Sequence, residues 1–504
     1  MLKNLKERVT SIKKSFNFLS NKNLLGGASF LISGTIAGQA LILITAPFIT
    51  RLFTPDELGI LAIFGAILTI LGSISTFRYE ISIPQPKNDI DATALLSLAI
   101  IINFIFTILI TFFVYLFGET ILSLLNANEI NNYLWTIPIG VCIAGLVKIY
   151  TYWALRKEMF STVALTRFQQ GGGMAFSQVF FGFLNLSSFG LIIGYLIGLG
   201  AGLSRLIYFW SKNGAKKVKG ISISLINKMG KRYKDLPLFS TWGGLINVLG
   251  LQLPIILFAS LFSPYLVGFY LLAHRVANAP VQLVAESIGK VFYIASIKEL
   301  RAKKLDELVL KVFRLLLRIS LLPFFILTII APEFFFIVFG SDWLEAGIYL
   351  QYMIIWLASS FIFVPLMTLF AALEKHKFDL IFQIFLVLVR AAGIYIGSVL
   401  GGPIMAIALF SILSALVYIL FGMWLIKLSG INYITQIKVF SIEFATPFSI
   451  ALIFYLIKDW LLADQILSIS NPLIYLIFAL ALVLVIFSLY NSRSLFLIIQ
   501  KYSN

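Results

Sequence analysis

Blocks of about 20 apolar residues recur along the whole chain and constrain its fold more than any other feature. A helix needs about 20 apolar residues to cross the ~30 Å hydrocarbon core of a bilayer. Residues 95–117, 191–210 and 472–490 are clear examples. Only 12% of the 504 residues are charged, whereas roughly 25% are charged in an ordinary soluble domain. The sequence therefore predicts an all-α polytopic membrane protein.

These blocks predict about fourteen transmembrane helices. The predicted spans are 24–49, 57–77, 94–117, 134–152, 161–184, 189–210, 237–259, 265–294, 310–331, 346–371, 379–399, 404–426, 439–460 and 472–491. We expect an N-lobe at 24–210 (spans 1–6), a basic cytoplasmic linker at 211–236, and a C-lobe at 237–426 (spans 7–12). Spans 13 and 14 and a cytoplasmic tail occupy 427–504. Residues 1–23 are basic with apolar residues at helical spacing, which predicts an amphipathic helix on the membrane surface; a frayed, solvated tail is the alternative.

The distribution of basic residues predicts the orientation, because Lys and Arg concentrate in short cytoplasmic loops. With the N-terminus inside, the outer loops and adjoining span ends hold only Arg51 and Lys458 as basic residues. The linker alone holds Lys212, Lys216, Lys217, Lys219, Lys228, Lys231, Arg232 and Lys234. We therefore expect a multi-pass protein of the bacterial cytoplasmic (inner) membrane with both termini cytoplasmic. The net charge of +17 then reflects the topology and attracts anionic membrane lipids. We expect no role in nucleic-acid binding.

A short motif occurs once in each predicted lobe. Leu52–Pro55 followed by Gly59 resembles Leu261–Pro264 followed by Gly268. In both lobes the motif joins the first span to the second on the outer face. Because each lobe has an even number of spans, both copies enter the membrane in the same direction. The lobes are therefore expected to be related by a pseudo-twofold axis along the membrane normal, as in transporters that enclose a central site.

The predicted span 265–294 carries a polar stripe. Arg275 lies ten residues from its outer start, about 15 Å deep, and Asn278, Gln282 and Glu286 follow at spacings that share one helical face. Pro280 should kink the helix. A charge at this depth costs at least ~2.5–3.5 kcal/mol unless it faces protein or water. We interpret the stripe as one wall of a hydrated cavity; internal ion pairs or interhelical hydrogen bonds are the alternative.

Other charged residues lie at various depths. Arg390 is again near mid-depth, and Arg167 is shallower, so both are candidate cavity residues. Arg78 and Glu80 end span 2 at the inner face and, with Glu286, are gate or ion-coupling candidates; solvated helix ends are the alternative. Lys148, Arg205, Arg314 and Arg318 are within reach of the inner surface, where long side chains snorkel to water.

The inventory of reactive residues argues against an enzyme. The chain has one cysteine, Cys142, and two histidines, His274 and His376, which provide no metal site and no disulfide. No His/Asp/Glu cluster has catalytic spacing. Gly171–Gly173 lacks the Lys-Ser/Thr of a phosphate-binding loop and instead favours close helix contact or a break. No cofactor is expected.

Three stretches of the chain form a recognisable set: Ile49–Gly59 followed by Phe77–Ile81, Tyr152–Lys157 leading to Phe160 and Arg167, and Phe339–Gly347 followed by Tyr349. In order and spacing they resemble the polysaccharide and O-antigen flippases of the multidrug/oligosaccharidyl-lipid/polysaccharide exporter superfamily. The resemblance covers most of the chain, and its motifs are specific for the family but not for the substrate.

The resemblance implies a flippase that moves an undecaprenyl-diphosphate-linked oligosaccharide to the outer leaflet by alternating access. Its cargo would be a repeat unit of O-antigen, the lipopolysaccharide side chain, or of another surface polysaccharide. Arg275 and Arg390 would contact phosphate or acidic sugars, since the planar guanidinium pairs bidentately with phosphate, while Asn278 and Gln282 would bind hydroxyls. H⁺ or Na⁺ is the candidate coupling ion, and a polysaccharide polymerase a candidate partner.

Spans 13 and 14 depart from the twelve spans of many family members. This departure leaves a peptidoglycan lipid-precursor flippase as an alternative. A cation-coupled multidrug exporter of the same superfamily is the other, although drug exporters generally use acidic cavity residues and the mid-depth charges here are mainly basic.

Overall fold

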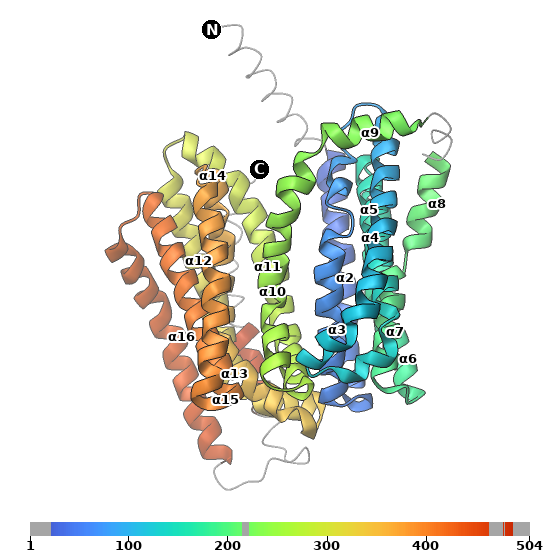
Figure 1. The fold of residues 1–504 in the computed structure, drawn as a ribbon. Helices are drawn as coiled ribbons and strands as arrows, with labels where there is room; N and C mark the ends of the chain where they lie inside the picture. The colour runs from blue at the N-terminus through green and yellow to red at the C-terminus, as the bar shows by residue number, and fades with distance from the viewer. Residues whose placement is uncertain (1–21, 214–220, 463–476, 478, 487–504) are drawn as a thin grey trace. The chain divides into compact units, whose positions relative to one another are not determined.

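A computed structural model describes residues 22–213, 221–462, 477 and 479–486. Every regular element in these ranges is helical (Figure 1). The predicted surface helix at 1–23 lies almost wholly outside the described residues, as do much of the predicted span 472–491 and the C-terminal tail.

The first half of the described chain forms helices where the apolar blocks predict them. They are α2 (Lys22–Leu52), α3 (Pro55–Ile74), α4 (Asp89–Leu124), α5 (Thr136–Arg156), α6 (Phe160–Phe183), α7 (Ser187–Gly200) and α8 (Leu203–Asn213). A 3₁₀ turn, η1 (Tyr79–Ser82), follows α3, and a short amphipathic helix, α9 (Ile223–Arg232), lies in the predicted linker. Ser222 caps α9, because its hydroxyl accepts from the Leu225 N–H.

The second half continues the pattern. Its helices are α10 (Thr241–Leu261), α11 (Pro264–Arg301), α12 (Leu305–Phe339), α13 (Leu344–Met367), α14 (Leu369–Ala372), α15 (His376–Leu428) and α16 (Tyr433–Leu462). The long α15 covers the predicted spans 379–399 and 404–426. Its backbone leaves helical geometry at Gly401 and Gly402, where φ is −164° and +73°, and Pro403 follows. The helix therefore breaks between the two predicted spans.

Ten helical segments in the described part of the chain are long and apolar enough to cross a membrane. The helices α6 and α11, which also coincide with predicted spans, are not among them although they have 24 and 38 residues. Both contain more polar residues than their neighbours, including Arg167 in α6 and Arg275 in α11. Helices of this kind in a membrane protein pack against protein or water rather than lipid. The prediction of an all-α, multi-pass membrane protein is confirmed.

The chain divides into two compact units. Unit 1 comprises residues 1–53 and 64–249, and unit 2 comprises residues 54–63 and 250–504. The helix α3 therefore begins in unit 2 and ends in unit 1. The domain boundaries given above and the pseudo-twofold axis stay predictions.

Unit 1 is held together by close helix packing at glycines. A Cβ added at Gly171 of α6 would lie 2.3 Å from the Gly38 carbonyl oxygen of α2, and one at Gly34 would lie 2.3 Å from the Ala164 oxygen. Small residues allow helix backbones to approach closely where lipid offers no hydrophobic driving force. The Gly171–Gly173 run thus provides close helix contact, and α6 continues through it without a break.

In unit 2 two ion pairs fasten α16 to α12. Arg318 Nε and Nη2 lie 2.7 and 2.8 Å from the two Glu443 carboxylate oxygens, the bidentate geometry that gives charged pairs their strength. Near the other end, Lys458 Nζ lies 2.6 Å from Glu333 Oε1. The predicted thirteenth span is therefore part of the packed body of unit 2.

Candidate functional site

Four charged side chains gather in unit 1 on three elements. They are Arg78 and Glu80, which follow α3, Lys148 of α5 and Arg167 of α6; together we call them the basic cluster. The charges of Glu80, Arg78 and Arg167 all act on Lys148, and the same three act on Tyr152, one turn further along α5. Two arginines and one carboxylate therefore lie within electrostatic range of Lys148 and Tyr152.

An unusual backbone turn presents Arg78. The helix α3 ends at Ile74, and Phe77 and Arg78 then adopt φ values of 44° and 59°, a left-handed region that residues with a side chain seldom enter. The turn directs the Arg78 guanidinium toward the start of α10, where Nη1 lies 3.3 Å from Ser240 Oγ. A Cβ added at Gly244 would lie 2.4 Å from Arg78 Cζ, so this contact requires a glycine.

Glu80 and Lys148 are held by their surroundings. Glu80 is 4% exposed, and its Oε2 accepts from Thr76 Oγ1 at 2.5 Å. Lys148 donates from Nζ to the Gly72 carbonyl oxygen at 2.6 Å, near the end of α3. Each charge therefore has one polar partner fixed by the fold and retains capacity for further hydrogen bonds, since an ammonium group has three donors.

Arg167 is positioned from the other side of the cluster. Its Nη1 donates to Gln170 Oε1 at 3.1 Å, and Gln170 Nε2 donates in turn to the Leu199 carbonyl oxygen of α7 at 2.9 Å. The Arg167 side chain is exposed. A guanidinium group that is oriented by an amide and still accessible can receive an anionic group.

Arg390 has a different environment, inside unit 2. It is 5% exposed, and its Cζ lies 5.1 Å from the ring centroid of Trp356 and 5.6 Å from that of Phe410. Its Nε is 3.4 Å from Ser414 Oγ, and its Nη1 is 3.5 Å from the Gly250 carbonyl oxygen. Cation–π contacts with aromatic rings stabilise a buried guanidinium without a carboxylate.

The polar stripe of α11 is described in part. The helix is continuous from Pro264 to Arg301, so the positions of Arg275, Asn278, Gln282 and Glu286 share one face as predicted. Arg275 and Asn278 are half-buried. The side chains of Gln282, Glu286 and Pro280 lie outside the described set, and the kink stays a prediction.

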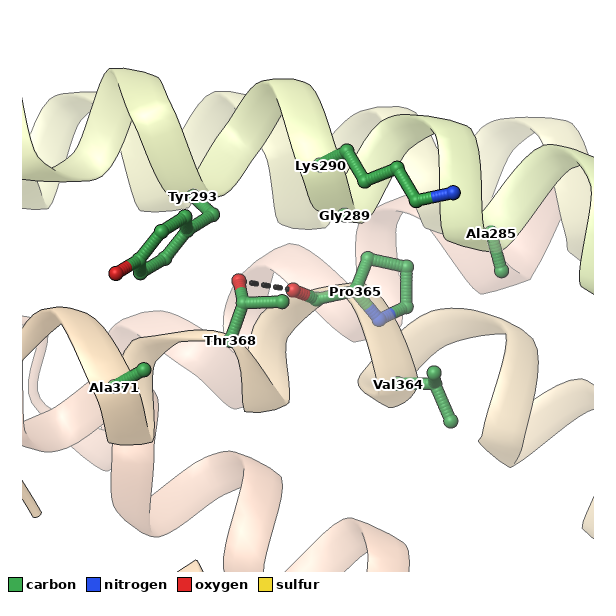
Figure 2. Close-up of a pocket in the computed structure, with 8 residues that line it drawn as sticks. All are labelled: Ala285, Gly289, Lys290, Tyr293, Val364, Pro365, Thr368 and Ala371. Atoms are coloured by element: carbon green, nitrogen blue, oxygen red, sulfur yellow. Dashed lines mark hydrogen bonds between the residues drawn. The ribbon is translucent and has the colours of Figure 1, made fainter. Parts of the chain in front are cut away.

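Beyond the stripe, α11 borders a cavity in unit 2 of about 420 Å³. Its lining is Ala285, Gly289, Lys290, Tyr293, Val364, Pro365, Thr368 and Ala371. Figure 2 shows Lys290 and Tyr293 extending from α11, and opposite them Thr368, whose Oγ1 donates to the Pro365 carbonyl oxygen at 2.7 Å. Apart from Lys290 and two hydroxyls the wall is apolar, so this cavity suits hydrocarbon better than a charged head group.

The basic cluster joins Arg167, a predicted cavity residue, with Arg78 and Glu80, both predicted gate or ion-coupling residues. It also includes Lys148, which was predicted to snorkel to the inner surface. Lys148 lies four residues before Tyr152, at the start of the second family stretch, and this helical spacing was the one available signal. Among the described residues no group of His, Cys, Asp and Glu could hold a metal ion.

Solved structures of transporters have folds similar to that of this chain. The chain resembles "Lipid II flippase MurJ, inward closed conformation" with a TM-score of 0.72 and 16% identity, over 92% of this chain and 98% of that one. It resembles an inward-facing multidrug resistance MATE family transporter of the MOP superfamily with a TM-score of 0.60 and 14% identity, over 78% and 95%. The Vibrio cholerae MATE transporter VcmN gives a TM-score of 0.52 and 18% identity, over 81% and 95%. At these identities the likeness shows the fold alone.

Sequence comparison identifies the family to which the chain belongs. No curated protein matches the chain. Residues 48–347, which contain the three stretches quoted above except for Tyr349, match a family described as "Polysaccharide biosynthesis protein". This match, together with the shared fold, confirms the resemblance drawn from those stretches. The chain therefore belongs to the polysaccharide biosynthesis protein family, with the fold of the MurJ and MATE transporters.

Proposed function

We propose that this protein is a flippase. It moves an undecaprenyl-diphosphate-linked oligosaccharide, such as an O-antigen repeat unit, from the inner to the outer leaflet of the bacterial cytoplasmic membrane by alternating access. The family and the transporter fold support a transport function. The basic cluster is the observation that supports a phosphate-containing substrate. Both termini are cytoplasmic in this proposal, because the basic linker and tail require it.

The basic cluster matches a diphosphate in charge and in hydrogen-bonding capacity. Three cations and one carboxylate leave a surplus of positive charge, and a lipid diphosphate carries two negative phosphates. Hydrogen bonds from Arg and Lys to phosphate are about twice as strong as neutral ones. The sugar hydroxyls need polar partners inside the membrane, since each unsatisfied group costs several kcal/mol. Tyr152 and Gln170 are placed to supply such partners.

Glu80 completes the arrangement. Like charges close together repel, and the repulsion is stronger away from bulk water. The Glu80 carboxylate offsets part of this repulsion when no substrate is bound. We assign Glu80 and Arg78 to the inner gate: phosphate competes with Glu80 for the cations, so substrate binding changes the contacts that Arg78 makes with the start of α10.

The candidates in unit 2 have different roles in this proposal. Arg275 and Asn278 remain substrate contacts, with Gln282 and Glu286 on the same face. Arg390 we assign to stabilising unit 2, because Trp356 and Phe410 cover its guanidinium group. H⁺ or Na⁺ is the proposed coupling ion, and a polysaccharide polymerase is the proposed partner that consumes the product.

Transport by reconstituted protein tests the proposal. Proteoliposomes carrying a fluorescent polyprenyl-diphosphate oligosaccharide would be assayed for its movement between leaflets. Arg167→Ala and Lys148→Ala should each lower the rate, while Arg314→Ala removes an exposed basic residue outside the cluster and serves as the control. Equal rates for all three variants would contradict the proposal. A peptidoglycan lipid precursor, assayed in parallel, tests the alternative flippase function.

One observation favours a second candidate, a cation-coupled multidrug exporter. Glu80 is a buried carboxylate among cations in unit 1, and a proton or Na⁺ could exchange there. This candidate predicts that deletion of the gene lowers tolerance to cationic drugs while the surface polysaccharide is unchanged. The flippase predicts the reverse, with lipid-linked repeat units retained on the inner leaflet.

A further inference from the structure

A second cavity lies within unit 2, where the start of α16 meets three other helices. The helix α12 packs against α13 and α16, and α13 packs against α15 (Figure 1). The space between the four helices has a volume of about 230 Å³, and we call it the α16 cavity. Its lining is Phe313 and Leu317 of α12, Ile362 and Phe363 of α13, Ile419 and Met423 of α15, and Gln436, Ile437 and Phe440 of α16.

The wall of the α16 cavity is apolar apart from Gln436. Three of the described lining residues are phenylalanines, and none of them is charged. An engineered apolar cavity of about 150 Å³ in another protein binds benzene. The α16 cavity therefore has room for one substituted benzene ring but not for a phospholipid.

Gln436 presents an unsatisfied hydrogen-bond acceptor. The residue is 1% exposed, and its Nε2 donates to the Ile431 carbonyl oxygen at 2.9 Å. Because only the nitrogen of the amide can donate, this bond fixes the orientation of the amide group. The other end, Oε1, is buried and has no hydrogen-bond partner among the described residues. A buried acceptor without a partner is destabilising, so a ligand that donates one hydrogen bond here gains more than a purely apolar ligand.

The turn before α16 holds Gln436 in place. Asn432 caps the helix, because its Oδ1 accepts from the Thr435 N–H at 2.8 Å. The Ile431 N–H donates to the Ile426 carbonyl oxygen in the last turn of α15 at 3.4 Å. The Gln436 amide is bound to the carbonyl group of the same Ile431. The acceptor is therefore preorganised, and binding of a ligand to it costs little conformational entropy.

The lipid-facing side of α16 gives a ligand access to the cavity. Phe313 and Leu317 are buried, whereas Ile437 and Phe440 are 56% and 41% exposed. The helix is long and apolar enough to cross a membrane, and exposed apolar side chains on such a helix contact lipid. A compound dissolved in the bilayer therefore has a route into the cavity past these two side chains.

We propose that the α16 cavity binds a small, neutral, membrane-soluble phenol, with its ring among the three phenylalanines and its hydroxyl donating to Gln436 Oε1. The ring fits the volume and the aromatic wall, since aromatic rings attract one another in edge-on and offset arrangements. The hydroxyl satisfies the buried acceptor, and an apolar wall favours a ligand without charge. The inference goes beyond the proposed function, because no residue of the basic cluster takes part.

Binding measurements on the full chain in nanodiscs test the site. The probes are para-fluorophenol and para-fluorotoluene, which have similar shapes and differ in the hydrogen-bond donor. Fluorine NMR gives the affinity of each probe, corrected for its partition into nanodiscs without protein. After this correction the phenol should bind about fivefold more tightly than the toluene. Equal corrected affinities would overturn the proposal.

Two glutamine variants locate the hydroxyl. Gln436→Leu removes the acceptor, so the ratio of the two corrected affinities should fall to about one. Gln351→Leu is the matched control, because Gln351 Nε2 also donates to a backbone carbonyl oxygen, that of Thr328 at 2.7 Å, and does so outside the cavity lining. This control should keep the preference for the phenol. A preference that persists in Gln436→Leu, or one that disappears in both variants, would overturn the proposal.

A variant that fills the cavity separates specific binding from partition into lipid. Met423→Trp introduces a larger side chain and should abolish the corrected binding of both probes. Saturating para-fluorophenol should also raise the melting temperature of the unsubstituted protein, because it binds the folded state, but not that of Met423→Trp. Equal shifts in the two proteins would contradict the site. If the variants do not accumulate, the comparison of the two probes on the unsubstituted protein decides the question.

Discussion

The basic cluster of unit 1 and Arg390 of unit 2 place cationic groups inside a membrane protein in opposite ways. In the cluster, Arg167 is exposed, and Lys148 lies within electrostatic range of Arg78, Arg167 and the Glu80 carboxylate. Arg390, in contrast, is 5% exposed and lies over two aromatic rings. At Arg390 two aromatic rings of the protein cover the guanidinium group, whereas the Arg167 side chain remains accessible.

This difference shows how to distinguish a charged residue that binds a ligand from one that stabilises the fold. A group of cations repel one another, and an anion or water must supply the missing stabilisation. A single guanidinium between Trp and Phe rings gains cation–π and packing energy without a ligand. Depth along a span, which first singled out Arg390, does not distinguish these situations; the residues on neighbouring helices do.

The largest expected effect comes from removing two charges of the cluster together. The double variant Lys148→Ala/Arg167→Ala should lower transport by at least about 100-fold, because charge-assisted hydrogen bonds contribute about 1.5–3 kcal/mol each. Its abundance should remain near normal. Transport would be measured in proteoliposomes at matched protein density. A rate within a fewfold of the unsubstituted protein would show that the cluster does not bind the moving group.

The reverse outcome is expected at Arg390. Arg390→Ala should destabilise unit 2 by about 2 kcal/mol or more, through lost packing and cation–π energy, while transport per folded molecule changes little. Thermal unfolding of the detergent-purified protein, followed by tryptophan fluorescence, measures the first quantity. If stability is normal and transport is lost, Arg390 belongs with the substrate contacts and the contrast between the units fails.

Variants of Arg275 test whether the α11 stripe binds substrate or stabilises the protein. If Arg275 contacts the substrate, Arg275→Ala should lower transport by about tenfold or more at normal abundance. Arg275→Lys should then keep part of the activity, because an ammonium retains the charge but not the bidentate geometry. If Arg275 instead pairs with another group of the protein, Arg275→Ala should lower abundance and melting temperature. Measuring both for the two variants separates the classes. Full transport at normal abundance would exclude both.

The sequence predicts the helices well because membrane insertion depends on local composition. The apolar blocks place the long helices from α2 to α16, though not the amphipathic α9 of the linker, and Gly401-Gly402-Pro403 lies between the two predicted spans within α15. The relation between Gly59 and Gly268 is likewise visible as a repeat. Their direct contact, in which each glycine packs on the proline carbonyl of the other copy, is not visible, since the repeat indicates equivalent positions and not neighbouring ones.

The site was only partly predictable, because local composition does not show which helices pack together. Arg78, Glu80 and Arg167 are recognisable as charges near or within spans, but Lys148 joins them through the packing of α3, α5 and α6. The rings over Arg390 come from α13 and from the second half of α15, and no local pattern near Arg390 indicates them. The environment of a charge is set by residues distant in sequence.

The smallest expected effect tests the cluster without changing any charge. A Cβ at Gly244 would lie 2.4 Å from Arg78 Cζ, whereas one at the adjacent Gly243 meets nothing within 4 Å. Both substitutions raise helix propensity by a similar amount, about 1 kcal/mol. Gly244→Ala should displace the guanidinium, the mobile end of a long side chain, so folding is preserved while transport falls. We expect a loss of about tenfold, since displacement of a positioning group by about 1 Å can cost up to 10²-fold, and no loss in Gly243→Ala. Equal rates in the two variants would show that the position of Arg78 does not matter, and would reduce the cluster to Lys148 and Arg167.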